Sequence, residues 1–377
     1  MLFMSKRSGV LATISAAVIA ATFSGSVLAA GPTVPTGTTS IKGQGASFPA
    51  PIYNYWASKF KASLPGNKRV QFSYAATGSG SGIAAITNNP PLANFGASDA
   101  AMSNTEIGNV PNANGDVLHV PMVLGAVALG INVKQCSITT LTLTGANIGD
   151  IYQGKIKNWN DSSLRSNGRN NKLSSCNLKI TPVRRSDSSG TTFVFTSYLK
   201  QKTTPYWASK GSLPTKQYGS WPTGVGAVRN SGVALKVKNT PGGIGYMELS
   251  YANQASLLKA RVQNGAKSNF VAPTSSSTSS AANNWNSANE ADLRYEPVIG
   301  ANGFNSYPIV AYTFVLLLTN APNQDKGLAT LGYLYWSLTS GQGYASSLGY
   351  APLPAGVKAK SINQLHKVKS GGNALWP

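Results

Sequence analysis

The chain has 377 residues, 42% of them hydrophobic, and carries 32 Lys and Arg against 11 Asp and Glu, a formal net charge of +21. This length predicts either one large domain or two domains, with an ordinary hydrophobic core. The few acidic residues include no spaced carboxylate pair of the kind used in glycoside or metal chemistry. The positive charge favours attraction to anions, which leaves polyanions and a small anionic ligand as open alternatives.

The first 30 residues have the pattern of a secretory signal peptide. Lys6 and Arg7 precede an apolar run over 10–23, and small residues follow up to a cleavage position after Ala29 or Ala30. No other segment approaches the roughly 20 apolar residues of a membrane-spanning helix. Because no cysteine lies near the cleavage position, a lipid anchor there is excluded. We therefore expect an exported, unanchored protein with a flexible leader over 31–40.

Beyond residue 41, short apolar runs alternate with amphipathic stretches. The patterns predict strands over 69–74, 92–99, 178–185 and 307–318, two strand-length runs within 117–133, and helices over 82–87, 141–159, 191–201 and 327–350. A glycine-rich turn, a strand and a helix start are expected over 241–254, and a low-complexity surface loop over 273–284. Alternating strands and helices indicate an α/β fold with largely parallel sheets.

The chain contains two cysteines, Cys136 and Cys176. Export to an oxidising compartment favours a disulfide between them, and two buried free thiols are the alternative. A zinc site is disfavoured, because His119 and His366 are the two histidines and neither has the spacing of a zinc ligand. No metal and no organic cofactor is expected.

Four segments place small polar residues at a turn that opens a helix or follows a strand. They are GQGASFPAPIYNYW (43–56), ATGSGSGIAAI (76–86), FGASDAAMS (95–103) and RRSDSSGTTFVF (184–195). A helix start leaves backbone N–H groups unpaired and carries partial positive charge. Each segment alone is consistent with an ordinary helix cap. Together they predict a metal-free site for a phosphate-like anion, to which Arg184 or Arg185 would add a charged contact.

Nucleophilic catalysis is the competing interpretation of the same segments. Ser47, Ser79, Ser189 and Thr191 all occupy turn-to-helix positions, but a nucleophilic hydroxyl normally needs a base within reach. The two histidines lie in unremarkable contexts, LHV and LHK. The run GSGSG (78–82) also lacks the order G-x-S-x-G, because position 80 is Gly. We therefore do not expect an enzyme.

Six motifs, read in order, resemble the periplasmic phosphate-binding protein of the phosphate ABC transporter. They are GQGASFPAPIYNYW, YAATGSGSGI, NFGASDA, IGDIYQGKIKNWND, VRRSDSSGTTFVFTSYL and GGIGYMELSYA, and the similarity extends from about Ile41 to about Pro354. The resemblance implies the two-lobed type II periplasmic-binding-protein fold, each lobe a mostly parallel sheet flanked by helices. Lobe I would comprise 41–127 and 306–377 and lobe II 128–305, with hinge crossovers near 126–130 and 303–307.

The resemblance also implies a ligand set. The phosphate ligands would be Ser47, Phe48, Ser79, Asp99, Arg185, Ser189, Gly190 and Thr191, with Asp187 holding Arg185 by an ion pair. Two departures from the family pattern stand out. Ser47 replaces a frequent Thr, and GSGSG replaces the usual GSSGG, which leaves Ser81 as an alternative to Ser79.

Asp99 would act as the filter for the anion, and the alternative is that it merely caps the following turn. An ionised carboxylate only accepts hydrogen bonds, so it suits hydrogen phosphate, which has a proton to donate, and disfavours sulfate, which has none. We expect a monomeric periplasmic receptor that delivers phosphate to membrane permease and ATPase subunits. Nucleic acid is not an expected partner. The alternative functions are a secreted phosphohydrolase that reuses the anion site and a basic surface protein that binds polyanions.

Overall fold

The computed structural model describes residues 31–203, 205–210, 221–283 and 292–377. The predicted signal peptide, residues 1–30, lies outside these ranges. Among the described residues, no helix combines the length and the apolar character needed to cross a bilayer.

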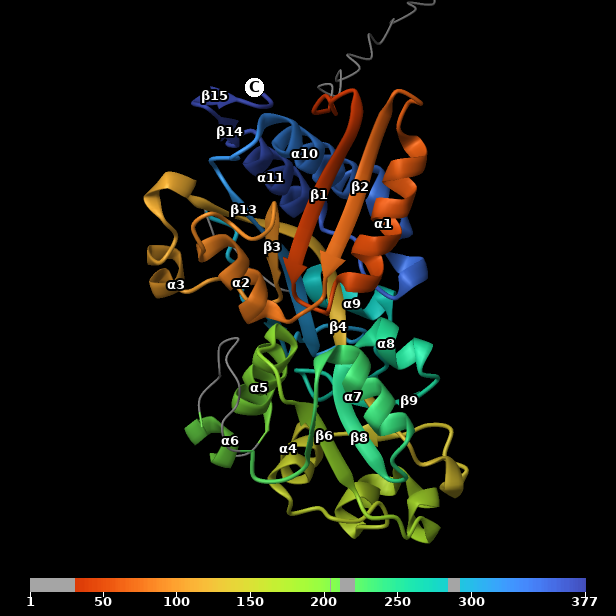
Figure 1. Cartoon of the computed structure of the whole chain (residues 1–377). Coiled ribbons are helices and arrows are strands. Elements are labelled where there is room, and N and C mark those ends of the chain that lie inside the picture. Colours follow the sequence, from red (N-terminus) through yellow and green to blue (C-terminus); the bar gives the residue numbers. More distant parts are fainter. Residues whose placement is uncertain (1–30, 204, 211–220, 284–291) are drawn as a thin grey trace, which may run out of the picture. The chain divides into compact units, whose positions relative to one another are not determined.

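A ten-stranded mixed sheet organises the described chain, in the order β2-β1-β3-β13-β4-β8-β6-β7, with β12 beside β13 and β9 beside β4 (Figure 1). Its strands are β1 Gly37–Gly45, β2 Lys68–Ala75, β3 Phe95–Ser98, β4 Val117–Ile131, β6 Thr181–Arg185, β7 Val225–Ala227, β8 Gly243–Glu248, β9 Leu258–Lys259, β12 Val298–Ile299 and β13 Ile309–Leu318. Strands β1, β2 and β3 are parallel, as are β6, β7 and β8, whereas β4 and β13 pair antiparallel with their neighbours. A small sheet contains β5 Thr142–Leu143, β10 Arg261–Gln263 and β11 Phe270–Val271, and a two-stranded one contains β14 Lys369–Ser370 and β15 Asn373–Ala374.

Helices flank both ends of this sheet, which confirms the predicted α/β fold (Figure 1). They are α1 Ala50–Ser63, α2 Ser79–Thr87, α3 Asn104–Gly108, α4 Gly145–Gln153, α5 Gly190–Lys202, α6 Pro205–Lys210, α7 Arg229–Lys238, α8 Leu249–Gln254, α9 Ser275–Asn283, α10 Gln324–Leu338 and α11 Ala355–Leu365. Helices α1, α2 and α10 pack against β1, β2 and β3, while α5, α7 and α8 pack against β4 and β8.

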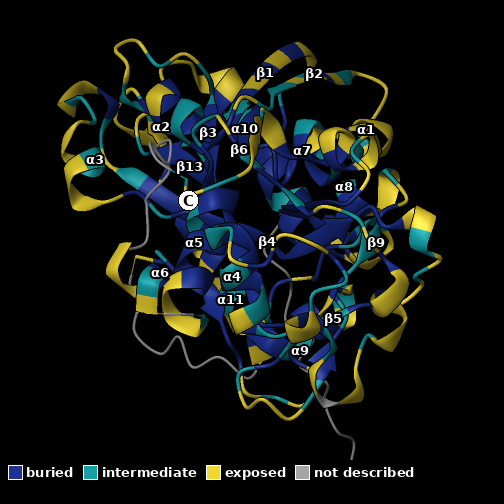
Figure 2. Cartoon of the chain, turned by 90° about the horizontal axis from the view of Figure 1, so that it is seen from below, coloured by how far each residue is buried: buried dark blue, intermediate teal, exposed yellow. Residues whose placement is uncertain are grey.

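Strand β4 is one continuous, almost entirely buried strand of 15 residues, not the two separate runs that the sequence pattern predicts. Residues 117–126 pair with β13, and residues 127–131 pair with β8. The partner therefore changes between Ala126 and Val127. Because β4 has a hydrogen-bonded neighbour on each side of this point, the strand continues through it without a turn. Figure 2 shows the buried residues of β4 and β13 near the centre of the chain.

The low-complexity stretch 273–284 was predicted as a surface loop, and this prediction is wrong. Its residues 275–283 form α9, which packs against β4 and β13 with Ser277, Thr278 and Ala281 buried. Thr274 begins the helix, because its Oγ1 accepts a hydrogen bond from the Ser277 N–H at 3.0 Å. Small side chains allow a helix to approach a sheet closely, so tertiary packing outweighs the weak helix propensity of serine.

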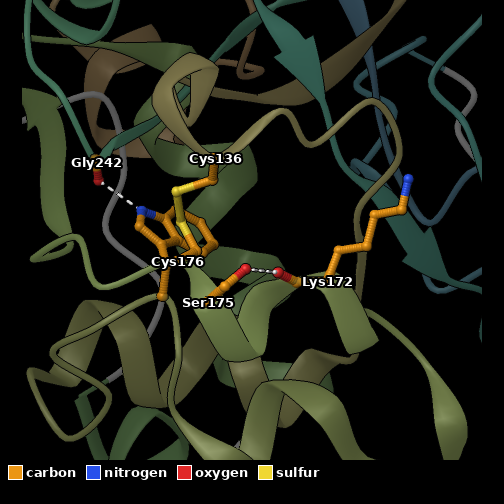
Figure 3. Close-up of a disulfide and its surroundings, with 6 residues drawn as sticks. Cys136, Lys172, Ser175, Cys176 and Gly242 are labelled. Atoms are coloured by element: carbon orange, nitrogen blue, oxygen red, sulfur yellow. Dashed lines mark hydrogen bonds between the residues drawn. A yellow bond between two sulfur atoms is a disulfide. The ribbon is translucent and has the colours of Figure 1, made fainter.

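Cys136 and Cys176 form a disulfide, as predicted (Figure 3). The bond joins two short 3₁₀ segments, Lys134–Cys136 and Asn171–Ser175, the second of which ends next to Cys176. Nearby, Trp159 Nε1 donates to the Gly242 carbonyl at 3.0 Å. The crosslink thus joins the segment that follows β4 to the segment that precedes β6.

Removing this disulfide should destabilise the protein without changing its fold. The two cysteines are 40 residues apart in sequence, and closing a loop of that size reduces unfolded-chain entropy by about 4 kcal/mol of folding free energy. The variant that carries both Cys136→Ser and Cys176→Ser should lose a comparable free energy of unfolding in urea titrations. The variant should be as unstable as the wild type with its disulfide reduced. Equal stability of the oxidised wild type, the reduced wild type and the variant would contradict this prediction.

Candidate functional site

The predicted anion-site segments meet where α2 and α5 begin. Gly78, at φ +103°, precedes α2, and a Cβ atom built on it would lie 2.3 Å from the Ser188 carbonyl oxygen. A Cβ on Gly190 would lie 2.7 Å from both Asp99 Cβ and Ser79 Oγ. Both positions therefore require glycine, because any side chain would push the two helix starts apart.

Ser79 lies at the centre of this contact. The residue is 1% exposed. Its hydroxyl oxygen accepts hydrogen bonds from the Gly190 N–H at 3.0 Å and the Asp99 N–H at 3.3 Å. Ser81, the alternative, is instead bonded to Gln44 and Thr77 on the outer side of the helix. Ser79 is thus the serine that the structure brings together with Asp99 and Gly190.

Asp99 follows β3 and is buried, with 3% of its surface exposed. Its Oδ2 accepts a hydrogen bond from Thr191 Oγ1 at 3.4 Å, whereas no described residue donates to Oδ1. Burial raises the pKa of Asp99 from 3.8 to about 7, and the nearby Arg185 charge and hydrogen bonds from Thr191 oppose this rise. The site therefore contains a buried carboxylate oxygen that lacks a hydrogen-bond donor.

Arg185, the last residue of β6, is held in a bidentate ion pair. Its Nε and Nη2 lie 2.6 and 2.5 Å from the two carboxylate oxygens of Asp187, and its side chain is 1% exposed. Its remaining terminal nitrogen, Nη1, lies 3.5 Å from Thr191 Oγ1. Asp187 is fixed in turn by the backbone N–H of Arg229 at 3.0 Å. Of the two arginines left open by the sequence, Arg185 therefore lies among the site residues, while Arg184 Nη1 contacts the Arg185 carbonyl.

Ser189, Gly190 and Thr191 form the start of α5. Ser189 is its N-cap, because its Oγ accepts from the Thr192 N–H at 3.1 Å. All three residues are buried. Their position places the N-terminus of a 13-residue helix, with its partial positive charge, next to Asp99 and Ser79.

Ser47 and Phe48 lie in the turn between β1 and α1, and tyrosine hydroxyls donate hydrogen bonds to the backbone carbonyls of that turn. Tyr74 donates to the carbonyl of Ala46 at 2.6 Å, Tyr251 to that of Ser47 at 2.6 Å, and Tyr350 to that of Phe48 at 2.7 Å. The Phe48 ring lies in the core, edge-on to Tyr350. Phe48 can therefore serve the site through its backbone and not through its side chain.

Asn230 is a buried site residue that the sequence analysis missed. It lies in the first turn of α7, and its Nδ2 donates to Ser47 Oγ at 3.0 Å and to Thr191 Oγ1 at 3.2 Å. Its Oδ1 accepts from the Glu248 N–H at 3.0 Å. The signal was present in GAVRNSG (226–232), a glycine-containing turn between a short strand and a helix, like the segments that were recognised.

The described residues offer no cluster of metal ligands, and neither histidine is placed to act as a base for the candidate serines. Within them, no three His, Cys, Asp or Glu side chains are grouped as metal ligands. His119 Nε2 accepts from the Met102 N–H at 3.0 Å, and burial lowers its pKa to about 4. His366 is stacked on Trp376, with its Nδ1 bonded to the Trp376 carbonyl. The geometry consequently suits anion binding better than nucleophilic catalysis.

Asp99 should make the ligand-free protein less stable as pH rises. A carboxyl group with a folded-state pKa of about 7 and an ordinary value of 3.8 binds its proton more tightly in the folded state. Ionisation of Asp99 therefore hardly lowers the free energy of unfolding at pH 4 and below. The loss of free energy of unfolding grows to about 4 kcal/mol by pH 7 and then stays nearly constant. Asp99→Asn should stabilise the phosphate-free protein by an amount that increases between pH 4 and 7, measured by urea unfolding. A stability difference independent of pH would contradict this assignment.

Comparisons with known proteins place the chain among binding proteins. A family model described as "PBP superfamily domain" matches residues 30–340. The phosphate-binding protein PstS of Xylella fastidiosa strain 9a5c is 36% identical over 321 residues, which cover 85% of this chain and 83% of that protein. PstS of Pasteurella multocida strain Pm70 is 34% identical over 350 residues, 90% of this chain and 94% of that protein.

A solved structure shares the fold. It is a high-affinity periplasmic phosphate-binding protein (PfluDING) bound with phosphate, with a TM-score of 0.66 and 23% identity, covering 85% of this chain and 92% of that one. This likeness concerns the architecture, while the sequence identities establish the relationship. The chain therefore belongs to the PBP superfamily and, within it, to the family of the PstS phosphate-binding proteins.

Proposed function

We propose that this chain captures hydrogen phosphate at the meeting point of α1, α2 and α5 and delivers it to a membrane ABC importer. The single observation that carries the proposal is Asp99 Oδ1, a buried carboxylate oxygen to which no described residue donates a hydrogen bond. The relatives of this chain are phosphate-binding proteins, and the chain matches them over most of its length.

The ligand set proposed is Ser47, Phe48, Ser79, Asp99, Arg185, Ser189, Gly190 and Thr191. In the structure, several of these groups bond to one another, as Gly190 N–H does to Ser79 Oγ. A phosphate oxygen would replace such contacts with stronger, charge-assisted ones. Asp187 neutralises Arg185, so one positive and two negative side chains leave no net attraction for an anion. Binding would depend instead on helix N-termini and hydroxyl donors.

Asp99 would select the anion by its protonation. An ionised carboxylate accepts the proton of hydrogen phosphate, whereas sulfate would face it with a second acceptor in a buried site. Leaving a buried polar group of this kind unpaired lowers the binding affinity far more than losing a surface contact does. The same logic leaves arsenate, which is also protonated near neutral pH, as a competing ligand.

Residues 41–127 and 306–377 would form one lobe and residues 128–305 the other. The change of β4 partner between Ala126 and Val127 supports the first crossover, near 126–130, and the pairing of β12 with the start of β13 supports the second, near 303–307. Contacts such as Asn230 with Ser47 join the two proposed lobes, as in a closed cleft. Hinge motion between open and closed forms would control capture and release.

Export would place this receptor in the periplasm. The signal-peptide pattern of residues 1–30 supports this, as does the structural similarity to PfluDING, which is a periplasmic protein. Membrane permease and ATPase subunits would then be its partners, and the chain would act as a monomer. An enzyme is not proposed, because the relatives are binding proteins and the histidines described above are engaged elsewhere.

Calorimetric titration of refolded, phosphate-free mature protein should show tight one-to-one binding of phosphate and no heat with sulfate at pH 8. Asp99→Asn, whose amide can donate as well as accept, should weaken phosphate binding by about tenfold to a hundredfold and let sulfate bind. Weak binding of both anions that fades steeply with added salt would instead favour the polyanion-binding alternative.

Sulfate discrimination should also depend on pH. As pH falls through the Asp99 pKa of about 7, the carboxyl gains a proton that it can donate to sulfate. Sulfate affinity of the wild type should therefore rise between pH 8 and 5, measured by calorimetry. Asp99→Asn is the matched control and should bind sulfate equally well across this range. A flat profile in the wild type would show that Asp99 does not act as the filter.

A further inference from the structure

The side-chain amide of Asn230 has only one possible orientation. The Glu248 backbone N–H, which is purely a donor, lies 3.0 Å from one end of this amide, so that end must be the oxygen. The NH₂ end consequently faces Ser47 Oγ at 3.0 Å and Thr191 Oγ1 at 3.2 Å. Asn230 is fully buried, so water cannot substitute for any of these partners.

This orientation determines what the two hydroxyls can do. A hydroxyl has one hydrogen to donate and two lone pairs to accept with. Ser47 Oγ accepts from both Nδ2 and the backbone N–H of Asn230, the latter at 3.2 Å, so both lone pairs are used. Thr191 Oγ1 accepts from Asn230 and lies 3.5 Å from Arg185 Nη1. Ser47 Oγ is therefore left with one hydrogen to donate, whereas Thr191 Oγ1 donates its hydrogen to Asp99 Oδ2 at 3.4 Å.

The backbone before Asn230 is strained in a way that serves this arrangement. Arg229 is not a glycine but has φ +64°, a conformation that costs free energy for an L-residue with a side chain. Its N–H points to Asp187 Oδ1, and the next N–H, that of Asn230, points to Ser47 Oγ. One strained turn therefore aligns donors on both the Asp187–Arg185 pair and the Ser47 hydroxyl.

We propose that Asn230 is a positioning residue of the anion site: it occupies both lone pairs of Ser47 Oγ, so that this hydroxyl presents its hydrogen to a bound oxyanion. Asn230 also donates to Thr191 Oγ1, which leaves the Thr191 hydrogen directed at Asp99 Oδ2. This inference rests on the proposed function. Asn230 itself need not touch the anion. Because Ser47 belongs to residues 41–127 and Thr191 to residues 128–305, the same amide also links the two proposed lobes when they are together.

The proposal predicts energetic coupling, which double-mutant cycles measure. Asn230→Leu keeps the size of the side chain and removes its hydrogen bonds, and it should weaken phosphate binding by about tenfold to a hundredfold. In a Ser47→Ala background, which has no hydroxyl to orient, the same change should cost several-fold less. Ser79→Ala is the matched control, because Ser79 accepts from Gly190 and Asp99, and there the two effects should multiply.

Asn230→Asp provides a second, independent variant. It would present acceptors to both hydroxyls, so the Ser47 hydrogen would turn away from the anion and the Thr191 hydrogen away from Asp99, and affinity should fall at least as far as in Asn230→Leu. Thermal melting of each phosphate-free variant checks that it folds, and Asn230→Ser replaces Asn230→Leu in the cycle if the latter does not.

The outcomes separate this proposal from the function on which it rests. If wild type fails to bind phosphate, both the proposed function and this inference are overturned. If wild type binds but the Asn230 and Ser47 effects multiply as fully as those of Asn230 and Ser79, the positioning role alone is overturned. Unchanged phosphate affinity in Asn230→Leu would also overturn it.

Discussion

The close approach of two helix starts is the constraint on which the site depends. Gly78 and Gly190 leave no room for a Cβ atom, so α2 and α5 meet with Ser79 between them. This contact encloses Asp99, removes it from water and raises its pKa to about 7. The close contact at Gly78 and Gly190 thus makes the aspartate at the end of β3 a buried hydrogen-bond acceptor.

The charges around Asp99 are arranged for recognition more than for attraction. Asp187 holds Arg185 through two of its nitrogens, which fixes the guanidinium and offsets its charge. Apart from Arg185 and Asp99, the groups that would meet an anion are then neutral dipoles: helix N-termini, backbone N–H groups and oriented hydroxyls. Such dipoles distinguish donors from acceptors on a ligand, which a net positive surface cannot do. The strongly basic composition of the chain is therefore not what would make this site selective.

Much of this was predictable from sequence because it is local. A strand ending in Asp99 and the helix start after RRSDSSG follow from residue types within one turn, and Asp187 reaches Arg185 two residues away. Contacts between distant segments were less accessible. The choice of Ser79 over Ser81 depends on which side of α2 faces α5, and Asn230 gains its role from Ser47, which lies 183 residues earlier in the chain. Helix α9 was taken for a loop because its serines form a helix only when packed against β4 and β13.

Selection of phosphate would depend on an ionised Asp99 that accepts a hydrogen bond from a proton carried by the ligand. Neutron diffraction from crystals of the phosphate complex, grown in deuterated buffer at pH 8, would locate that proton directly. We expect a deuteron bonded to a phosphate oxygen and directed at Asp99 Oδ1, with Asp99 itself unprotonated. A deuteron covalently bound to Asp99, or a carboxylate turned away from the phosphate, would contradict it.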